Sequence, residues 1–293
     1  MRNLLPEILT PGPVAAAVAE TYSVRDAASQ LERMAVSDCI ETLSLFRSGP
    51  WLAFRAEVQR LFDENDYALL RGFPLFEDGA GLLVAALTIG QTLRTYRGDK
   101  VIKTFKMSPW TKELSHTTKG GEFHTDLNTE PRPPAITAIQ CLVSDPGRPR
   151  YGVTRVARLR DLLEFVDRDG DTRTQRFLKD DTVAMLNDRA SVRWCGRIVE
   201  ADAIRYHPDT IRAAARRAGL PLQSLERCMT DVKQAAMSVS TSFVMQRRDI
   251  LLLSNHRTLH YRGPCSVVFR DFPTEFDSRR VAVLHVTRER HKP

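Results

Sequence analysis

Two residues separated by a single position limit the folds open to this chain more than any other pattern. They are His124 and Asp126, in the run GGEFHTD of residues 120–126. Side chains alternate between faces along an extended chain, so an imidazole and a carboxylate at this spacing point into the same small volume. The glycine pair of residues 120–121 permits backbone geometry that a side chain would block, which suits a tight entry into an expected strand that carries His124 and Asp126. His124 and Asp126 together supply two thirds of a facial triad, in which two histidines and one carboxylate hold Fe(II) and leave the other coordination positions of the metal open.

The second histidine that such a triad needs is predicted far downstream. Residues 248–264, RDILLLSNHRTLHYRGP, contain an apolar strand-like stretch, a turn and a second short strand. Alternation along the second strand directs Thr258, His260 and Arg262 to one face, which makes His260 available to the interior. His256 is the rival ligand, but it falls in the expected turn, so we favour His260. His116, upstream of the glycine pair, is expected to be a polar loop residue.

In order and spacing, these residues resemble the Fe(II)/2-oxoglutarate dioxygenases of the taurine dioxygenase and clavaminate synthase group. The resemblance covers residues 65–288 and includes His124-x-Asp126, Pro133-Pro134, Gly152-x-Thr154 and the Asn-x-Arg-x-Leu-His run that ends at His260. It implies an α+β, mainly β fold: a double-stranded β-helix, or jelly roll, with flanking helices and a helical insertion. A likeness of fold supports the reaction class and does not identify the substrate.

The resemblance also predicts one catalytic domain over residues 1–293. A chain of 293 residues can bury a full core, and triad halves that lie far apart in sequence must meet within one domain. Arg193, Arg205 and Arg212 lie in the expected insertion, where each could contact an anionic substrate or face solvent. The expected parts are an N-terminal helical arm (1–64), the jelly-roll core (65–156 and 240–288) and a largely helical lid or substrate insertion (157–239).

Apolar periodicity and breaker residues predict the individual elements. The expected strands are residues 67–74, 101–107, 135–143, 151–156, 240–244, 250–254, 258–262 and 281–286. The expected helices are residues 27–45, 51–63, 81–95, 159–165, 209–218 and 222–236.

Binding of the cosubstrate 2-oxoglutarate is implied by the same resemblance. A threonine after a glycine at this point of the family hydrogen-bonds a carboxylate of 2-oxoglutarate, and Thr154 matches it; the alternative is a strand threonine with no such role. The far carboxylate needs a cation in an enclosed pocket. The family commonly has two arginines four apart after the distal histidine, and matching Arg280 to the first leaves Leu284 at the second. We expect Arg280 to bind the carboxylate, with Arg279 and Arg270 as alternatives.

The implied reaction oxidises a small metabolite with oxygen and 2-oxoglutarate, releasing succinate and carbon dioxide. Asp126 favours oxygen insertion over halogenation, because the halogenating branch of the family has a small residue there. Hydroxylation, desaturation and ring closure share these ligands, and a biosynthetic role is expected. Zinc is the competing metal, since two histidines and one aspartate also bind it with a water, which would give a metal-dependent hydrolase. A third hypothesis is a noncatalytic metabolite-binding or sensor protein that keeps the jelly roll.

The charge balance favours an anionic small-molecule partner. There are 43 Lys and Arg residues against 36 Asp and Glu, a formal net charge of +7, and most of the cations are Arg. The planar guanidinium suits carboxylates and phosphates. Nucleic-acid binding is the alternative interpretation of the basic balance. It is disfavoured because the basic residues are scattered among acidic ones and form no basic tail.

Cysteine usage and hydropathy predict where the protein works. The cysteines are widely spaced and form no Cys-x-x-Cys pair, which indicates reduced thiols without a disulfide framework or a zinc site. They are Cys39, Cys141, Cys195, Cys228 and Cys265. The sequence has neither the sustained apolar region of a signal peptide nor a segment long enough to cross a bilayer. We therefore expect a cytoplasmic protein with no membrane partner.

Overall fold

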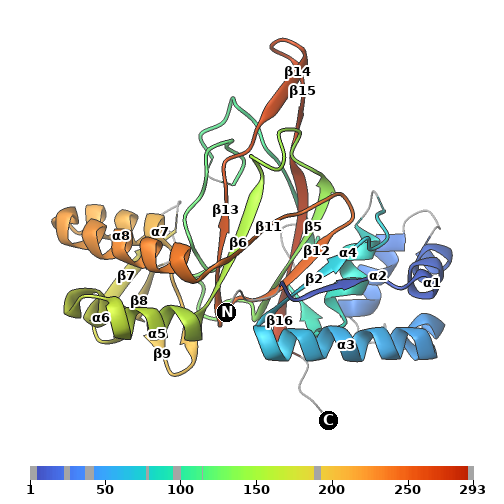
Figure 1. Cartoon of the computed structure of the whole chain (residues 1–293), viewed down its shortest axis with the longest axis horizontal. Helices are drawn as coiled ribbons and strands as arrows, with labels where there is room; N and C mark the ends of the chain where they lie inside the picture. Colours follow the sequence, from blue (N-terminus) through green and yellow to red (C-terminus); the bar gives the residue numbers. More distant parts are fainter. Residues whose placement is uncertain are drawn as a thin grey trace.

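The structure is a computed structural model of the chain, which describes residues 5–22, 27–36, 43–76, 79–94, 100–113, 115–187 and 193–289. Most of the strands stand in the middle of the molecule, with helices α1–α4 on one side and helices α5–α8, together with β7–β9, on the other (Figure 1). The helices are α1 (Gly12–Tyr22), α2 (Ala27–Val36), a 3-10 turn (Ser44–Arg47), α3 (Gly49–Asn65), α4 (Ala80–Ala86), α5 (Leu159–Asp169), α6 (Thr172–Lys179), α7 (Pro208–Arg217) and α8 (Leu222–Val239).

Most of the described strands belong to two sheets, and the others form three separate pairs. The first strands are β1 (Glu7–Leu9), β2 (Tyr67–Arg71), β3 (Gly90–Leu93), β4 (Ile102–Lys106), β5 (Ile136–Val143), β6 (Val153–Arg158), β7 (Thr182–Leu186) and β8 (Arg193–Arg197). They are followed by β9 (Val199–Glu200), β10 (Ala203–Ile204), β11 (Thr241–Val244), β12 (Ile250–Ser254), β13 (Thr258–Arg262), β14 (Val267–Asp271), β15 (Glu275–Ser278) and β16 (Arg280–Glu289).

The larger sheet has the order β1-β2-β12-β5-β16-β3, and β4 also pairs with β16. Its outer face is covered by helices α1–α4. Leu70, Leu252 and Leu284 on this face join Trp51 and Phe54 of α3 in one buried core. Helix α3 buries apolar residues that recur every three or four positions, so they form one stripe along it.

The inner face of the larger sheet packs on a smaller sheet with the order β11-β6-β13. Leu69 and Leu253 of the larger sheet meet Val156 and Phe243 of the smaller one in a shared core. Because side chains alternate along a strand, β2, β5 and β12 of the larger sheet contribute to both cores. On β12, Leu252 faces the helices while Leu253 faces the smaller sheet.

Residues 157–239, predicted to be a largely helical insertion and called the insertion below, contain α5–α8 and the strand pairs β7–β8 and β9–β10. The insertion has a core of its own, to which Leu162 of α5 and Val232 of α8 contribute. Phe123 and Leu259 belong to this same core. The insertion is therefore anchored on the two chain segments that carry His124 and His260.

The structure differs from the predicted elements in two informative places. The helix expected over residues 81–95 ends at Ala86, and β3 follows, paired with β16. The segment of β3 therefore pairs at the edge of the sheet although its local pattern favours a helix. Gly90, which has no side chain, lets this segment approach Val286 closely. Residues 263–280, to which no element was assigned, contain the hairpin β14–β15, which projects at the top of Figure 1. The helix expected over residues 27–45 is α2 as far as Val36, and residues 37–42 lie outside the described ranges.

Two expectations from composition concern thiols and membranes. Cys141, Cys195, Cys228 and Cys265 are free thiols, and Cys39 lies outside the described residues. Among the helices of the described ranges, none combines the length and hydropathy that a bilayer crossing needs.

Candidate metal centre

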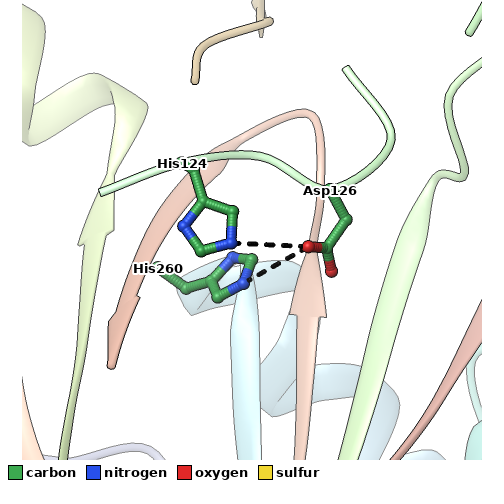
Figure 2. Close-up of side chains that lie close together, drawn as sticks. All are labelled: His124, Asp126 and His260. Atoms are coloured by element: carbon green, nitrogen blue, oxygen red, sulfur yellow. Dashed lines mark ion pairs between the residues drawn. The ribbon is translucent and has the colours of Figure 1, made fainter. Parts of the chain in front are cut away.

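The structure brings His124, Asp126 and His260 together. One ligand atom from each lies within 4.8 Å of the others. His124 Nε2 is 3.5 Å and His260 Nε2 is 3.7 Å from Asp126 Oδ1. Figure 2 shows both imidazoles directed at this one carboxylate oxygen. The convergence of these three side chains, predicted from two distant segments, is confirmed.

Backbone pairing sets the positions of the two imidazoles. The N–H groups of His124 and His260 each donate to the other residue's carbonyl oxygen over 3.1 Å. Residues opposite each other in an antiparallel pair carry their side chains to the same face, so the rings lie side by side, 4.2 Å between centroids. The chain then turns at Asp126 and does not continue as the expected strand. Asn255 secures this turn: its Oδ1 accepts from the Asp126 N–H at 2.7 Å and its Nδ2 donates to the Asp126 carbonyl at 3.0 Å.

A hydrogen bond selects the nitrogen of His124 that faces the site. Its Nδ1 lies 2.8 Å from the carbonyl oxygen of Glu122. A carbonyl can only accept, so Nδ1 carries the proton and Nε2 presents a lone pair toward Asp126. Metal-binding histidines are commonly fixed in this way. His260 lacks such a bond, because its buried Nδ1 has no hydrogen-bond partner within the described part of the chain.

The second oxygen of Asp126 is engaged by side chains that the sequence analysis missed. Oδ2 lies 2.8 Å from the hydroxyl oxygen of Thr137 and 3.0 Å from Nε2 of His285. Thr137 lies on β5 and His285 on β16. No short-range motif marks either residue, since both reach the site through strand pairing.

The protonation states suit a cation site. Burial opposes ionisation of Asp126, but His260, His124 and His285 hold its pKa well below the usual range. Burial and the neighbouring His124 lower the pKa of His260 to about 3. Burial also disfavours charge on His124, yet its hydrogen bond to Asp126 raises its pKa above the usual value. The site thus offers an ionised carboxylate and the neutral imidazole of His260. The raised pKa of His124 means that metal binding there competes with a proton on Nε2.

The donor set fits ferrous iron. Two imidazole nitrogens and one carboxylate oxygen are the ligands of the facial triad. Bonds of about 2.0–2.2 Å to one ion would bring such atoms to roughly 3 Å of one another. The observed separations of 3.5 and 3.7 Å require only a small contraction.

Three other histidines clarify the boundaries of the site. His256 lies in the turn after β12, outside the cluster of ligand atoms. His116 packs on Phe105 with ring centroids 5.3 Å apart, in the loop position expected for it. His207, which the sequence analysis did not select, precedes α7 and lies with its ring 4.9 Å from that of His124. The insertion therefore contributes a side chain beside the triad.

The candidates for the cosubstrate are arranged differently from the prediction. Thr154 and Arg279 are both buried, and Arg279 donates from Nη2 to Thr154 Oγ1 over 3.1 Å. Arg280 is exposed, whereas the carboxylate was expected to need a cation in an enclosed pocket. By alternation along β16, Arg280 shares a strand face with Leu284, and that face is the one turned toward the helices. Arg270 is also exposed and pairs with Asp277 over 2.8 Å on the β14–β15 hairpin.

The insertion arginines considered for substrate contact have other contacts. Arg212 binds Glu226 over 2.7 Å and Asp209 over 2.9 Å, so two carboxylates offset its charge. Arg205 lies over the Trp194 ring at 4.7 Å and donates to the Glu130 carbonyl over 2.9 Å. Arg193 is exposed on β8.

A comparison with models of protein families shows to which family this chain belongs. The model of the family described as "Taurine catabolism dioxygenase TauD, TfdA family" matches residues 37–268, well over half of the chain. The protein belongs to the TauD/TfdA family. It is accordingly a non-haem Fe(II)/2-oxoglutarate dioxygenase, with Fe(II) and 2-oxoglutarate as its cofactor and cosubstrate and a small molecule as its substrate.

Solved structures similar to this TauD/TfdA protein share its mixed α+β fold. Asparagine oxygenase in complex with Fe(II), 2S,3S-3-hydroxyasparagine and succinate has a TM-score of 0.70 and 14% identity, over 96% of this chain and 94% of that one. OrfP in complex with Fe and alpha-ketoglutaric acid has a TM-score of 0.63 and 15% identity, over 96% and 94%. PvcB from Pseudomonas aeruginosa has a TM-score of 0.53 and 17% identity, over 79% of each chain. A search of curated proteins gave no match.

Proposed function

We propose that this dioxygenase hydroxylates a small metabolite that carries an anionic group. The convergence of His124, Asp126 and His260 carries the proposal. In the overall reaction, one oxygen atom of O2 enters a C–H bond of the substrate and the other enters succinate, while 2-oxoglutarate loses carbon dioxide. When bound, Fe(II) supplies the oxidising chemistry. The protein supplies ligands, a dry pocket and the orientation of the substrate.

The metal ligands in this proposal are three named atoms. Nε2 of His124, Nε2 of His260 and Oδ1 of Asp126 would hold Fe(II). The Glu122 carbonyl keeps the lone pair of His124 directed into the site. Asn255 holds the turn that presents Asp126.

Arg279 and Thr154 are proposed to bind the far carboxylate of 2-oxoglutarate. Arg279 is 4% exposed, and its Nη1 is buried without a hydrogen-bond partner among the described residues. A buried guanidinium that lacks an anion carries a large desolvation cost, which a bound carboxylate would offset. The Thr154 hydroxyl adjoins the same guanidinium. Arg279 therefore replaces Arg280 and Arg270 as the cosubstrate residue.

An anionic substrate is supported by a cation on the metal-site face of the larger sheet. Lys103 of β4 lies opposite Val283 of β16, and opposite residues share a face. On β16, residues 283 and 285 point the same way, so Lys103 lies on the face that carries His285. Partial burial and the nearby Arg94 lower the pKa of Lys103, while the charge of Asp126 works in the opposite direction. A carboxylate or phosphate of the substrate would be attracted here.

The insertion is proposed to form the substrate side and its cover. His207 is the observation behind this, because its ring contacts that of His124 from the start of α7. The insertion shares its core with Phe123 and Leu259, which are next to the metal ligands in sequence. This packing would hold the substrate side at a fixed position relative to the metal ligands.

We further propose a jelly-roll core and a single catalytic domain over residues 1–293. Support comes from the two facing sheets that enclose the triad. His260 and Thr154 belong to the smaller sheet, whereas His285 and Thr137 belong to the larger one. A site whose parts come from both sheets requires them to fold together.

The test is oxygen-dependent formation of succinate from 2-oxoglutarate with Fe(II), in the presence of a panel of amino acids and other small carboxylates and phosphates. The expected result is succinate formation that one class of compound stimulates, with a product heavier by one oxygen atom. No decarboxylation with any compound would favour a binding or sensor protein. Activity with Zn(II) in the absence of oxygen would favour a hydrolase.

A further inference from the structure

The two oxygens of Asp126 have separate environments. Oδ1 faces Nε2 of both His124 and His260, at 3.5 and 3.7 Å. Oδ2 instead lies 2.8 Å from the hydroxyl of Thr137 and 3.0 Å from Nε2 of His285. An ionised carboxylate can only accept hydrogen bonds, so the Thr137 hydroxyl and His285 Nε2 are both donors to Oδ2.

His285 and Thr137 are held where a precise contact can be made. They are opposite residues of β16 and β5, so their side chains share a face. Thr137 is fully buried and His285 is 6% exposed. The backbone of His285 is also held from its other side, because the N–H of Arg94 donates to the His285 carbonyl over 2.9 Å. Regular, buried strands hold a side chain more rigidly than a loop does.

His285 is poorly placed to bind the metal itself. The ligand atoms that lie within 4.8 Å of one another belong to His124, Asp126 and His260, and His285 is outside this group. Its Nε2 addresses the side of the carboxylate that points away from the two imidazoles. It can therefore act on the metal only through Asp126.

We propose that His285 and Thr137 are positioning residues that fix Asp126 as a ligand through one oxygen. By occupying Oδ2, they direct Oδ1 toward the metal and oppose coordination through both oxygens. A carboxylate bound through both would take one of the open positions that a facial triad needs for 2-oxoglutarate and oxygen. This inference rests on the proposed binding of metal by the triad.

The same strand face also links the metal ligand to the cosubstrate residue. Arg279 directly precedes β16 and, like His285, points between the sheets. Strand β16 thus supports Asp126 through His285, and the residue before the strand supplies the proposed carboxylate site. A change at His285 is expected to act on metal coordination without moving Arg279.

The experiment measures Mn(II) and Co(II) binding to the full chain without oxygen, by calorimetry and by the visible spectrum of Co(II). His285→Ala is expected to weaken Mn(II) binding about 10- to 100-fold, the usual effect of losing a partner of a metal ligand. It should also alter the Co(II) spectrum. His285→Gln, whose side-chain amide donates from a similar position, is expected to recover most of the affinity. Thr137→Val combined with His285→Ala should weaken binding more than either single change.

His116→Ala is the matched control, because His116 packs on Phe105 away from the triad. If His285→Ala does not fold, His285→Leu, which fills the space without a donor, is compared with His285→Gln. An unchanged affinity and Co(II) spectrum in the folded variant that lacks the donor would overturn the inference. Failure of the proposed function has a different signature: the wild-type chain and His124→Ala would then bind Mn(II) equally poorly.

Discussion

Arg279 and Thr154, 125 positions apart in the chain, meet through a hydrogen bond of 3.1 Å between the two sheets. The guanidinium is buried, and its Nη1 lacks a partner among the described residues. The adjacent Arg280 is exposed. Arg279 and Arg280 therefore give a sharp test of cosubstrate binding, because the two side chains have the same chemistry and differ in orientation.

Arg279→Met is expected to raise the Kd for 2-oxoglutarate by roughly 100-fold or more, since removing one partner of a buried charge pair costs about 2–5 kcal/mol. Arg280→Met should leave that Kd within about twofold of the wild-type value. Calorimetric titration of the Mn(II)-loaded protein without oxygen measures both. An equal loss in the two variants, or a loss confined to Arg280→Met, would assign the carboxylate site to Arg280.

Metal binding should stabilise the folded protein through the triad alone. A ligand that binds only the native state stabilises it in proportion to the logarithm of its excess over Kd, about 2.7 kcal/mol at a hundredfold excess. Mn(II) is therefore expected to raise the Tm of the wild-type chain and of His256→Ala, and to leave that of Asp126→Ala or His260→Ala unchanged. The measurement is a thermal melt with and without metal, after treatment with a chelator. A metal-dependent Tm in Asp126→Ala would exclude this carboxylate as a ligand.

Lys103 is the residue proposed to attract the anionic group of the substrate. Lys103→Met is expected to lower kcat/KM for the substrate about tenfold, because hydrogen bonds to charged groups contribute about 1.5–3 kcal/mol and this side chain is partly solvated. The KM for 2-oxoglutarate should not change. Lys106→Met is the control, since Lys106 lies on the same strand but faces the other way, over the Phe276 ring. Equal effects of both changes would mean that general charge, and not a specific contact, attracts the substrate.

The sequence was sufficient to predict the triad because its signals are local. The predicted alternation of side chains along residues 258–262 is confirmed at His260. Leu259 and Tyr261 pack on the insertion, while His260 faces the site. The His-x-Asp spacing predicted a shared volume for His124 and Asp126. It did so for a partly wrong reason, since the chain turns at Asp126 where a strand was expected. Asn255, inside the recognised run, holds that turn.

The choice of Arg280 and the omission of His285 have one cause. Periodicity identifies which residues of a strand share a face, but it does not say which face is turned inward. At the start of β16, a choice shifted by one residue exchanges Arg280 for Arg279, the residue before the strand. The inward face is set by strand pairing, which brings His285 opposite Thr137. Contacts between strands distant in sequence leave no signal within a single short window.

A final prediction concerns the packing that supports the larger sheet. Gly81 of α4 lies against the chain that leaves β2, and a Cβ atom on it would come within 2.2 Å of the Pro74 carbonyl oxygen. That oxygen also accepts a hydrogen bond from Gln140 of β5 over 3.3 Å, so it has little freedom to move. Gly81→Ala should therefore lower the free energy of unfolding by about 1–3 kcal/mol, as overpacking does.

Gly12 at the start of α1 is the matched control, because a Cβ atom there would meet nothing within 4 Å. Gly12→Ala should change the free energy of unfolding by no more than about 0.5 kcal/mol, as is usual for substitutions away from packed sites. Urea denaturation followed by circular dichroism gives both values, with equal slopes if the unfolded states are alike. If the two variants unfolded at the same urea concentration, the contact between α4 and Pro74 could not be a tight one, and the helix would be free to shift on the outer face of the sheet.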